Sequence, residues 1–399
     1  MTEMALARDA KAGCATARLA AAEPTPALNC VIVGDNPVKL WGLTPRQRFR
    51  RIMAAHHFIE QADIDAKGPA LLVNAGFVFD PAWLRHYATN PGAMLTLGGV
   101  PVLAACRDRA ERIAIADAMH QGATVEYPPG VTVDRVEDGV TMANSQLRKR
   151  EQPFVLPLTA QTMREAERAS YFGAYKGVTD LLTKYLWPEW ALTLTRVAAR
   201  FGITPNMVTA VGAIFCVLAT LLFWGGHYWA GIATGLVFMV LDTVDGKLAR
   251  CTITSSRWGN IFDHGLDLVH PPFWWYTWGI GLTAYGRPLA PDLFEAAMAA
   301  IIGGYVVQRM IEGAFMRIYG MHIHVWRPID SRFRLVTARR NPNMVILFAS
   351  MLIDRPELGL LAIALWTILS CVFHFVRLIQ AMTAHRAGFS VQSWLEQAQ

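Results

Sequence analysis

Four aspartates in the second half of the chain have the spacing of a metal site. Asp242 and Asp245 are three residues apart, and Asp263 and Asp267 are four residues apart. Residues at these intervals share one face of a helix. Two adjacent antiparallel helices would therefore bring four carboxylates together at one end. Such a collection of negative charge near a membrane is costly unless cations neutralise it.

The ligand type indicates which cations these would be and what they could do. Carboxylate oxygens favour magnesium, manganese or calcium. Two such ions suit displacement at a phosphorus atom, because they hold a diphosphate and the attacking oxygen together. Gly246 leaves room for a ligand, Ala249 stays small one turn later, and Arg250 can neutralise a phosphate. Each aspartate alone is more often a solvated helix-end carboxylate, so the prediction depends on the combined spacing.

The full pattern carries a family resemblance. It reads Asp242-x2-Asp245-Gly246-x2-Ala249-Arg250-x8-Gly259-x3-Asp263-x3-Asp267. These eight fixed positions match the signature of the CDP-alcohol phosphatidyltransferase family. At ~5–8% usage of each residue type, a chance match in one chain is below roughly one in a million. The resemblance extends to Thr204-Pro205-Asn206 with Thr209, and it covers roughly residues 176–385.

The resemblance implies a reaction and a set of site residues. The hydroxyl of a polar acceptor alcohol would attack a CDP-alcohol donor, CDP-diacylglycerol being the leading candidate, with release of CMP. Asp267, with Asp263, would be catalytic, Asp267 as the general base. Two divalent cations, Mg²⁺ or Mn²⁺, would polarise the hydroxyl, because a carboxylate beside cations is a weak base. The metal ligands would be Asp242, Asp245, Asp263 and Asp267, and the nucleotide contacts would be Gly246, Ala249, Arg250 and Gly259.

A basic segment, residues 327–343, is a second candidate site. Its arginines can bind a phosphate if the acceptor carries one. The alternative is that they only report membrane topology or contact anionic lipid. The candidate acceptor ligands are Arg332, Arg334, Arg339 and Arg340. The nearby histidines are expected to be packed or interfacial residues rather than ligands; these are His264, His270, His322 and His324.

Long uncharged runs after about Pro205 predict an α-helical membrane bundle. A crossing needs about 20 largely apolar residues. We expect six transmembrane helices, with Pro271-Pro272 bending the third. The excess of Arg and Lys in alternate short loops places the active site and both termini in the cytoplasm, at the inner membrane if the source is bacterial. The expected spans are residues 206–225, 228–248, 258–283, 293–311, 343–353 and 358–379.

An amphipathic segment precedes the first span. Large apolar residues recur there at intervals of three and four, which predicts a helix lying in the membrane surface. The alternative is an ordinary amphipathic helix packed on the soluble part of the chain. The apolar residues are Trp187, Trp190, Leu194, Val197 and Phe201.

The first half of the chain alternates strand-like and helix-like stretches, which predicts a cytoplasmic α/β domain. It weakly resembles the sugar-phosphate nucleotidyltransferase fold. Only Gly34 remains of the expected glycine-rich loop, and Asn74 stands where an aspartate would hold magnesium. Without a phosphate cradle and a metal ligand, nucleotidyl transfer is not expected. The domain is therefore interpreted as a degenerate relative.

The predicted organisation has five parts. They are a mobile leader (1–27), the α/β domain (28–170), a junction with the interfacial helix (171–203), the membrane domain (204–385) and a cytoplasmic tail (386–399). This order resembles bifunctional enzymes that make CDP-inositol and join it to inositol phosphate. A soluble CDP-inositol-type donor, with an inositol phosphate or lipid acceptor, therefore stays open. Six cysteines without a CxxC give no sign of a disulfide framework or a zinc site.

Two functions of another class stay open. A transporter would use buried carboxylates near mid-membrane, whereas Asp242 and Asp245 lie at the end of an apolar run beside Lys247 and Arg250. A non-catalytic membrane scaffold is the other, and the intact aspartate set argues against it. The expected partners are the CDP-alcohol, the acceptor alcohol and the lipid bilayer, without nucleic acid. Family members are commonly dimers, so a homodimer stays open.

Overall fold

The structure is a computed structural model, and its described residues form two compact units. It describes residues 29–56, 58–61, 64, 68–122, 130–255 and 257–397, without the side chains of 257, 260, 263 and 264. The predicted leader lies outside this range. The first unit contains residues up to 36, 49–77 and 83–138, and the second contains 37–48, 78–82 and 139–399. Residues 139–170, predicted to belong to the α/β domain, thus group with the helical unit.

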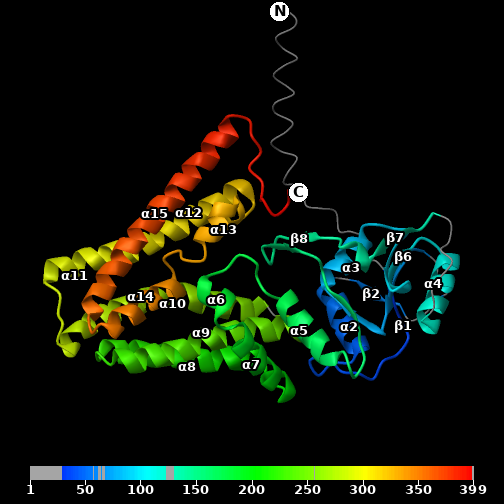
Figure 1. The fold of residues 1–399 in the computed structure, drawn as a ribbon, viewed down its shortest axis with the longest axis horizontal. Coiled ribbons are helices and arrows are strands. Elements are labelled where there is room, and N and C mark those ends of the chain that lie inside the picture. Colours follow the sequence, from blue (N-terminus) through cyan, green and yellow to red (C-terminus); the bar gives the residue numbers. More distant parts are fainter. Residues whose placement is uncertain are drawn as a thin grey trace, which may run out of the picture. The chain divides into compact units, whose positions relative to one another are not determined.

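The first unit is built on a mixed sheet (Figure 1). In the described part of the chain this sheet has six strands in the order β2-β1-β3-β6-β5-β7. The apolar runs of β1 and β3 pair in parallel, and β3 and β6 pair antiparallel. Helix α4 (Arg109–Gln121) packs on β6 and β3. The strands are β1 (Asn29–Val33), β2 (Ile59–Glu60), β3 (Ala70–Asn74), β5 (Ala93–Leu97), β6 (Val100–Cys106) and β7 (Thr132–Arg135).

The α/β prediction for this unit is confirmed. Strands β5 and β6 form an antiparallel pair, which Gly98 and Gly99 connect with positive φ angles of 57° and 81°. Asn74 is buried and tied to backbone groups. Its Nδ2 donates to the carbonyl of Pro101 at 2.9 Å, and its Oδ1 accepts from Gly76 N at 2.9 Å. Asn74 therefore holds a turn together at the position where the nucleotidyltransferase resemblance would require a metal-binding aspartate.

The second unit is mainly helical. Its short strands are β4 (Phe77–Phe79), which pairs with β10 (Val155–Pro157), and the hairpin of β8 (Met142–Asn144) and β9 (Lys149–Glu151). The helices that lead into the bundle are α5 (Met163–Gly173), α6 (Leu181–Tyr185) and α7 (Pro188–Arg200). The bundle contains α8 (Pro205–Trp224), α9 (Tyr228–Cys251), α10 (Arg257–Tyr285), α11 (Pro291–Met298), α12 (Gly304–Tyr319), α13 (Pro328–Phe333), α14 (Arg340–Leu352) and α15 (Pro356–Arg386).

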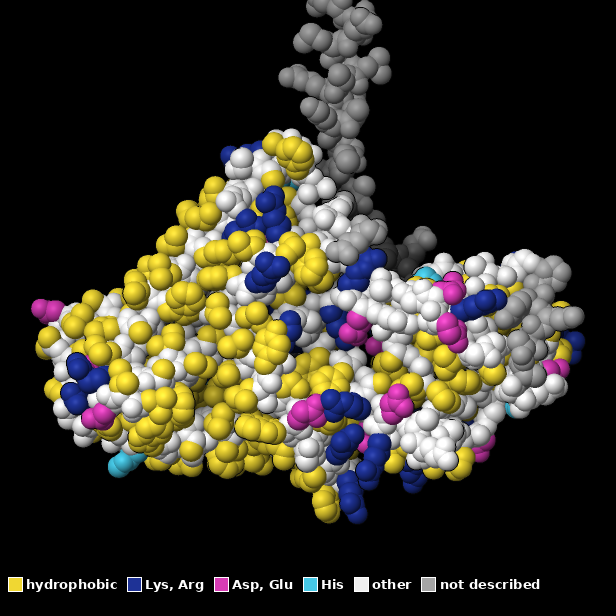
Figure 2. Space-filling view, in the orientation of Figure 1, with side chains coloured by type: hydrophobic (Ala, Val, Ile, Leu, Met, Phe, Trp, Pro, Cys, Tyr) yellow, Lys and Arg dark blue, Asp and Glu magenta, His cyan; other side chains and the backbone are white. Residues whose placement is uncertain are grey.

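Among the described residues, three helical stretches are long and apolar enough to cross a membrane. They are 205–224, 291–319 and 356–386, which coincide with the first, fourth and sixth predicted spans. Hydrophobic side chains also cover much of one face of this unit (Figure 2). Helix α14 has 13 residues. At 1.5 Å per residue it is about 20 Å long, shorter than a bilayer core of about 30 Å. The full set of six spans therefore stays a prediction.

Helix α7 has the exposed apolar face expected of an interfacial helix. Trp190, Leu194 and Val197 are exposed, whereas the opposite face buries Leu192 and Ala198 toward α9. Trp187, predicted to share the apolar face, is instead buried. A helix that packed its apolar face on the protein would hide these side chains, so their exposure favours the membrane-surface interpretation.

Helix α10 passes through Pro271 and Pro272 without ending. A proline has no N–H, so Pro272 leaves the carbonyl of Leu268, four residues earlier, without its helical donor. The hydroxyl of Tyr305 on α12 donates to that carbonyl at 2.9 Å. The proline therefore creates a backbone acceptor that ties α10 to α12.

The core of the bundle depends on close approach of α8 and α10. Gly281 lies so near the end of α8 that an added Cβ would stand 1.9 Å from the carbonyl oxygen of Phe223. Next to this contact, Tyr228 and Trp278 stack with ring centroids 4.1 Å apart. A small residue at position 281 is thus required for the two helices to meet.

We expect Gly281→Ala to destabilise the protein by about 3 kcal/mol, because the helices must separate to admit one methyl group. Thermal unfolding in detergent measures the change. Gly313→Ala is the matched control, since the structure shows open space beside that helical glycine and alanine is the better helix former. Equal unfolding temperatures for the two variants would contradict the close contact.

Candidate functional site

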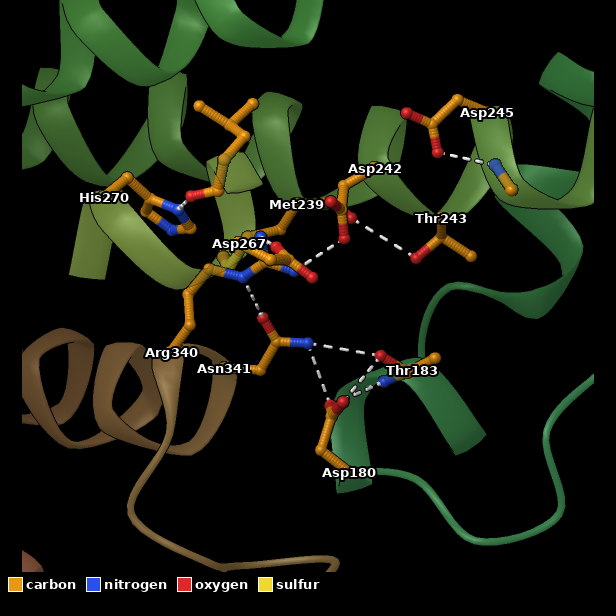
Figure 3. Close-up of polar contacts among 12 residues, drawn as sticks. Asp180, Thr183, Met239, Asp242, Thr243, Asp245, Asp267, His270, Arg340 and Asn341 are labelled. Atoms are coloured by element: carbon orange, nitrogen blue, oxygen red, sulfur yellow. Dashed lines mark hydrogen bonds and ion pairs between the residues drawn. The ribbon is translucent and has the colours of Figure 1, made fainter. Parts of the chain in front are cut away.

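Three helices place two of the motif aspartates around one arginine (Figure 3). Asp242 lies on the last turns of α9, Asp267 lies on α10, and Arg340 is the first residue of α14. Arg340 Nη2 donates to Asp242 Oδ2 at 2.7 Å, and Arg340 Nη1 donates to Asp267 Oδ1 at 2.7 Å. The arginine and Asp242 are largely buried, with 12% and 14% of their side chains exposed, while Asp267 is 47% exposed. The arrangement opens toward solvent on the Asp267 side.

Asp245 contacts the first helix of the bundle. It is buried, and its Oδ2 accepts a hydrogen bond from Thr209 Oγ1 on α8 at 2.6 Å. Thr209 belongs to the stretch that resembled the family's entry to its first span. The side chain of Asp263 lies outside the described residues, so the meeting of all four carboxylates stays a prediction.

The predicted nucleotide contacts follow Asp245 along α9. An added Cβ at Gly246 would stand 3.1 Å from Arg250 Nη2, so the guanidinium lies against the bare glycine backbone. Ala249, Arg250 and Gly259 are half-buried. Lys247, the residue after Gly246, is buried. Its Nζ donates to the carbonyl of Ala174 at 3.0 Å and lies over the Tyr175 ring.

A hydrogen-bond network, missed in the sequence, supports Arg340 from behind (Figure 3). Arg340 Nε donates to Asn341 Oδ1 at 3.0 Å, and Asn341 Nδ2 donates to Asp180 Oδ1 at 2.9 Å. Asp180 also caps α6 by accepting from Thr183 N at 3.0 Å. The sequence does carry a signal for Asp180, because an aspartate directly before a short helix is a typical N-cap.

Burial opposes ionisation of Asp180, but neighbouring groups outweigh that effect. The Arg334 guanidinium and the hydrogen bonds from Thr183 and Asn341 lower the pKa of the Asp180 carboxyl below its usual value. A carboxylate held in this way stabilises the folded state at neutral pH. Asp180 therefore links the junction electrostatically to the basic segment.

The four candidate acceptor arginines have different surroundings. Arg332 is exposed. Arg334 is buried, its Nε and Nη1 have no hydrogen-bond partner within the described structure, and burial lowers its pKa. Arg339 Nη2 donates to both carboxylate oxygens of Glu312, at 2.5 and 2.6 Å. Arg340 lies among the aspartates, so the four do not form one group.

Glu312 is at the centre of a second polar cluster, on α12. Ligand atoms of Glu312, His324 and His374 lie within 4.8 Å of one another. Arg309 also pairs with Glu312, at 3.1 Å. With two guanidinium groups on one carboxylate, the cluster already carries excess positive charge, which disfavours a further cation. The signal in the sequence was an acidic residue within an apolar run, which is rare in membrane helices.

The histidines are confirmed as packed residues where they are described, apart from His322, which is exposed. His270 Nδ1 lies 2.7 Å from the carbonyl of Leu266, and its ring packs against Phe238. His324 is buried, and burial lowers its pKa. The side chain of His264 is not among the described ones.

Comparisons with known proteins agree with the motif. Residues 202–369 match the sequence model of the family described as CDP-alcohol phosphatidyltransferase, and this range contains the whole aspartate pattern. The match confirms the family resemblance predicted from the sequence. It begins at residue 202, so it does not test the nucleotidyltransferase resemblance of residues 28–170.

Two similar curated proteins act on different alcohols by name. Cholinephosphotransferase 1 of Xenopus laevis is 32% identical over 124 residues, which are 28% of this chain and 30% of that protein. Phosphatidylinositol phosphate synthase of Mycobacteroides abscessus is 32% identical over 115 residues, which are 27% of this chain and 52% of that protein. The aligned region thus spans only about a third to a half of these relatives.

Among solved structures, the phosphatidylinositol phosphate synthase of Mycobacterium tuberculosis with CDP-DAG bound is similar over 48% of this chain and 94% of that chain. The sequence identity is 20% and the TM-score is 0.38.

We expect Asp180→Ala to cost about 2 kcal/mol of stability, because α6 loses its cap and Asn341 loses an acceptor. Asp180→Asn keeps the cap and removes only the charge, so it costs less. The pKa of Asp180 is depressed in the folded state. Its stabilisation is therefore complete above the unfolded value of about 3.9 and is lost as the pH falls through the folded value.

Thermal unfolding of wild type and Asp180→Asn between pH 7 and pH 3 tests this. The difference between the two proteins is expected to be constant from pH 7 to about pH 5 and to shrink at the acid end. A difference that grows on acidification would contradict the ionised state of Asp180.

Proposed function

We propose that this protein is a membrane-embedded CDP-alcohol phosphotransferase that moves a phosphoalcohol from a CDP-alcohol to the hydroxyl of a polar acceptor, releasing CMP. The observation that carries the proposal is the convergence of Asp242 and Asp267 from separate helices within the region that matches the family. A transporter or scaffold has no need of carboxylates paired in this family pattern.

The described carboxylates fit divalent cations. Asp242, Asp245 and Asp267 offer only oxygen atoms, the donor type that Mg²⁺ and Mn²⁺ prefer. Asp263 would complete the predicted set. Such ions, when bound, would neutralise the diphosphate and lower the pKa of the acceptor hydroxyl.

The chain's own residues have separate roles in this proposal. The guanidinium of Arg250 lies against Gly246, in the space that the missing side chain leaves. In this position it can bind a phosphate of the nucleotide. Asp267 is the most exposed of the described site aspartates and accepts the proton of the acceptor hydroxyl. The acceptor oxygen then bonds to the phosphorus that carries the donor's alcohol. The bond from that phosphorus to the CMP oxygen breaks, and CMP leaves with the electron pair.

The donor and the acceptor are separate questions. The names of the relatives include choline phosphotransferases and phosphatidylinositol phosphate synthases. Two donors must therefore be compared in an activity assay. One is the lipid CDP-diacylglycerol, and the other is a soluble CDP-linked polar alcohol. The three apolar helices support access to the bilayer. Six spans and a cytoplasmic active site complete the proposal, and a homodimer is compatible with it.

We expect purified protein to release CMP from CDP-diacylglycerol or from a CDP-linked polar alcohol only when Mg²⁺ or Mn²⁺ is present. Asp267→Asn is expected to lower kcat by a factor of about 10² to 10⁴, because the proton acceptor is lost. Asp242→Asn is expected to lower metal affinity as well. CMP release is followed by chromatography with labelled donor.

Asp292→Asn is the control, since this exposed aspartate begins α11 and lies outside the motif. Loss of a matched amount of activity in that variant would point to general damage. Absence of metal-dependent CMP release from either donor, across a panel of polar acceptors, would refute the proposed reaction.

Arg334 is the buried candidate acceptor ligand whose guanidinium has no carboxylate partner within the described structure, whereas Arg339 and Arg340 already bind carboxylates. If the acceptor is phosphorylated, Arg334→Gln is expected to raise its KM about tenfold or more, because a charged hydrogen bond is lost. The KM for the CDP-alcohol is expected to stay unchanged, which serves as the internal control. An equal rise in both KM values would assign Arg334 a structural role instead.

A further inference from the structure

Arg340 occupies the place where a cation is needed between two motif aspartates. We propose that Arg340 is a built-in counter-cation, which holds Asp242 and Asp267 together before metal binds and which divalent ions must displace. The inference rests on the proposed function, because it requires that divalent ions bind these aspartates. It adds a positioning residue that lies outside the aspartate motif.

The geometry is that of a bridge between helices. The two Nη atoms of Arg340 donate to different carboxylates, each at 2.7 Å, and the carboxylates come from α9 and α10. Asp242 Oδ2 and Asp267 Oδ1 are therefore occupied by the guanidinium. An oxygen that accepts an N–H at this distance cannot also bind a cation in the same direction, so a cation that uses these two oxygens must displace the guanidinium.

Charge explains why the aspartates can be held by Arg340 when no metal is bound and can still attract a divalent ion. Two carboxylates and one guanidinium leave one uncompensated negative charge in a mostly buried place. Without any cation, the two carboxylates would repel each other at low effective dielectric. The arginine relieves that repulsion only in part, so the pair of aspartates still attracts a divalent ion.

Arg340 keeps further contacts after leaving the carboxylates. Its Nε donates to Asn341 Oδ1 at 3.0 Å, and its guanidinium lies over the Phe238 ring at 5.0 Å. Asn341 is in turn fixed by Asp180. The side chain is therefore anchored near its head, and a displaced guanidinium stays close enough to bind a phosphate of the substrate.

The preceding arginine provides a natural comparison. Arg339 donates to Glu312 and, within the described structure, does not contact Asp242 or Asp267, although it is adjacent to Arg340 in the chain. Glu312 is bound by Arg339 and Arg309 together, so its single negative charge is more than balanced and stays paired when one arginine is removed. Loss of Arg339 therefore changes a different cluster and leaves the cation between Asp242 and Asp267 in place.

Mn²⁺ binding to the purified full chain in detergent tests the inference without any assay of activity. The Mn²⁺ that remains in solution is measured by electron paramagnetic resonance during titration. Arg340→Gln is expected to bind Mn²⁺ at least about tenfold more tightly than wild type, because the competing charge is gone. Arg340→Lys keeps the charge and is expected to stay near wild type. Arg339→Gln is the matched control, with unchanged affinity.

The outcomes separate this inference from the proposed function. Binding in wild type with equal or weaker binding in Arg340→Gln overturns the counter-cation role and leaves the metal site intact. Absence of binding in both proteins overturns the metal site and this inference together. The double variant Asp242→Asn with Arg340→Gln must lose the tight binding, which assigns it to this site. Thermal unfolding of each variant confirms that it is folded.

Discussion

The helical unit depends on one electrostatic constraint, which is that carboxylates from different helices can meet only around positive charge. Asp242 on α9 and Asp267 on α10 face the same guanidinium, and α14 begins at the residue that supplies it. The constraint fixes the relative placement of three helices at their polar ends. Their apolar parts can then pack by size, as Gly281 and Phe223 do where α10 meets α8.

The same constraint explains how the junction is joined to the site. Asp180 caps a helix, accepts a hydrogen bond from Asn341 and is stabilised as a carboxylate by the charge of Arg334. A single buried carboxylate thus aligns α6 with the basic segment and holds the residue that supports Arg340. A continuous path of hydrogen bonds, each 3.0 Å or shorter, thus runs from Asp180 through Asn341 and Arg340 to the two aspartates.

Patterns along the chain predicted helices and strands, but they do not determine which side chains meet across helices. Helices that carry the aspartate motif and an α/β first half followed from local sequence patterns, and both appear as expected. The partners of Arg339 and Arg340 depend on which helix lies opposite, and no spacing encodes that. Local patterns likewise placed a boundary at residue 170, whereas packing groups residues 139–170 with the helices. Trp187 shares an apolar stripe in sequence but is buried by a neighbour in space.

Charge balance distinguishes the two acidic centres of the bundle. Glu312 is surrounded by Arg309 and Arg339, so a cation arriving there would meet net positive charge. Asp242 and Asp267 share the guanidinium of Arg340, and one negative charge of these three groups remains uncompensated. Two consecutive arginines in one short segment therefore serve opposite purposes. Arg309 and Arg339 together leave the Glu312 centre net positive, whereas Arg340 holds Asp242 and Asp267 together with one negative charge uncompensated. If the proposed divalent ions bind there, they must compete with a cation that is singly charged, and an arginine meets that requirement.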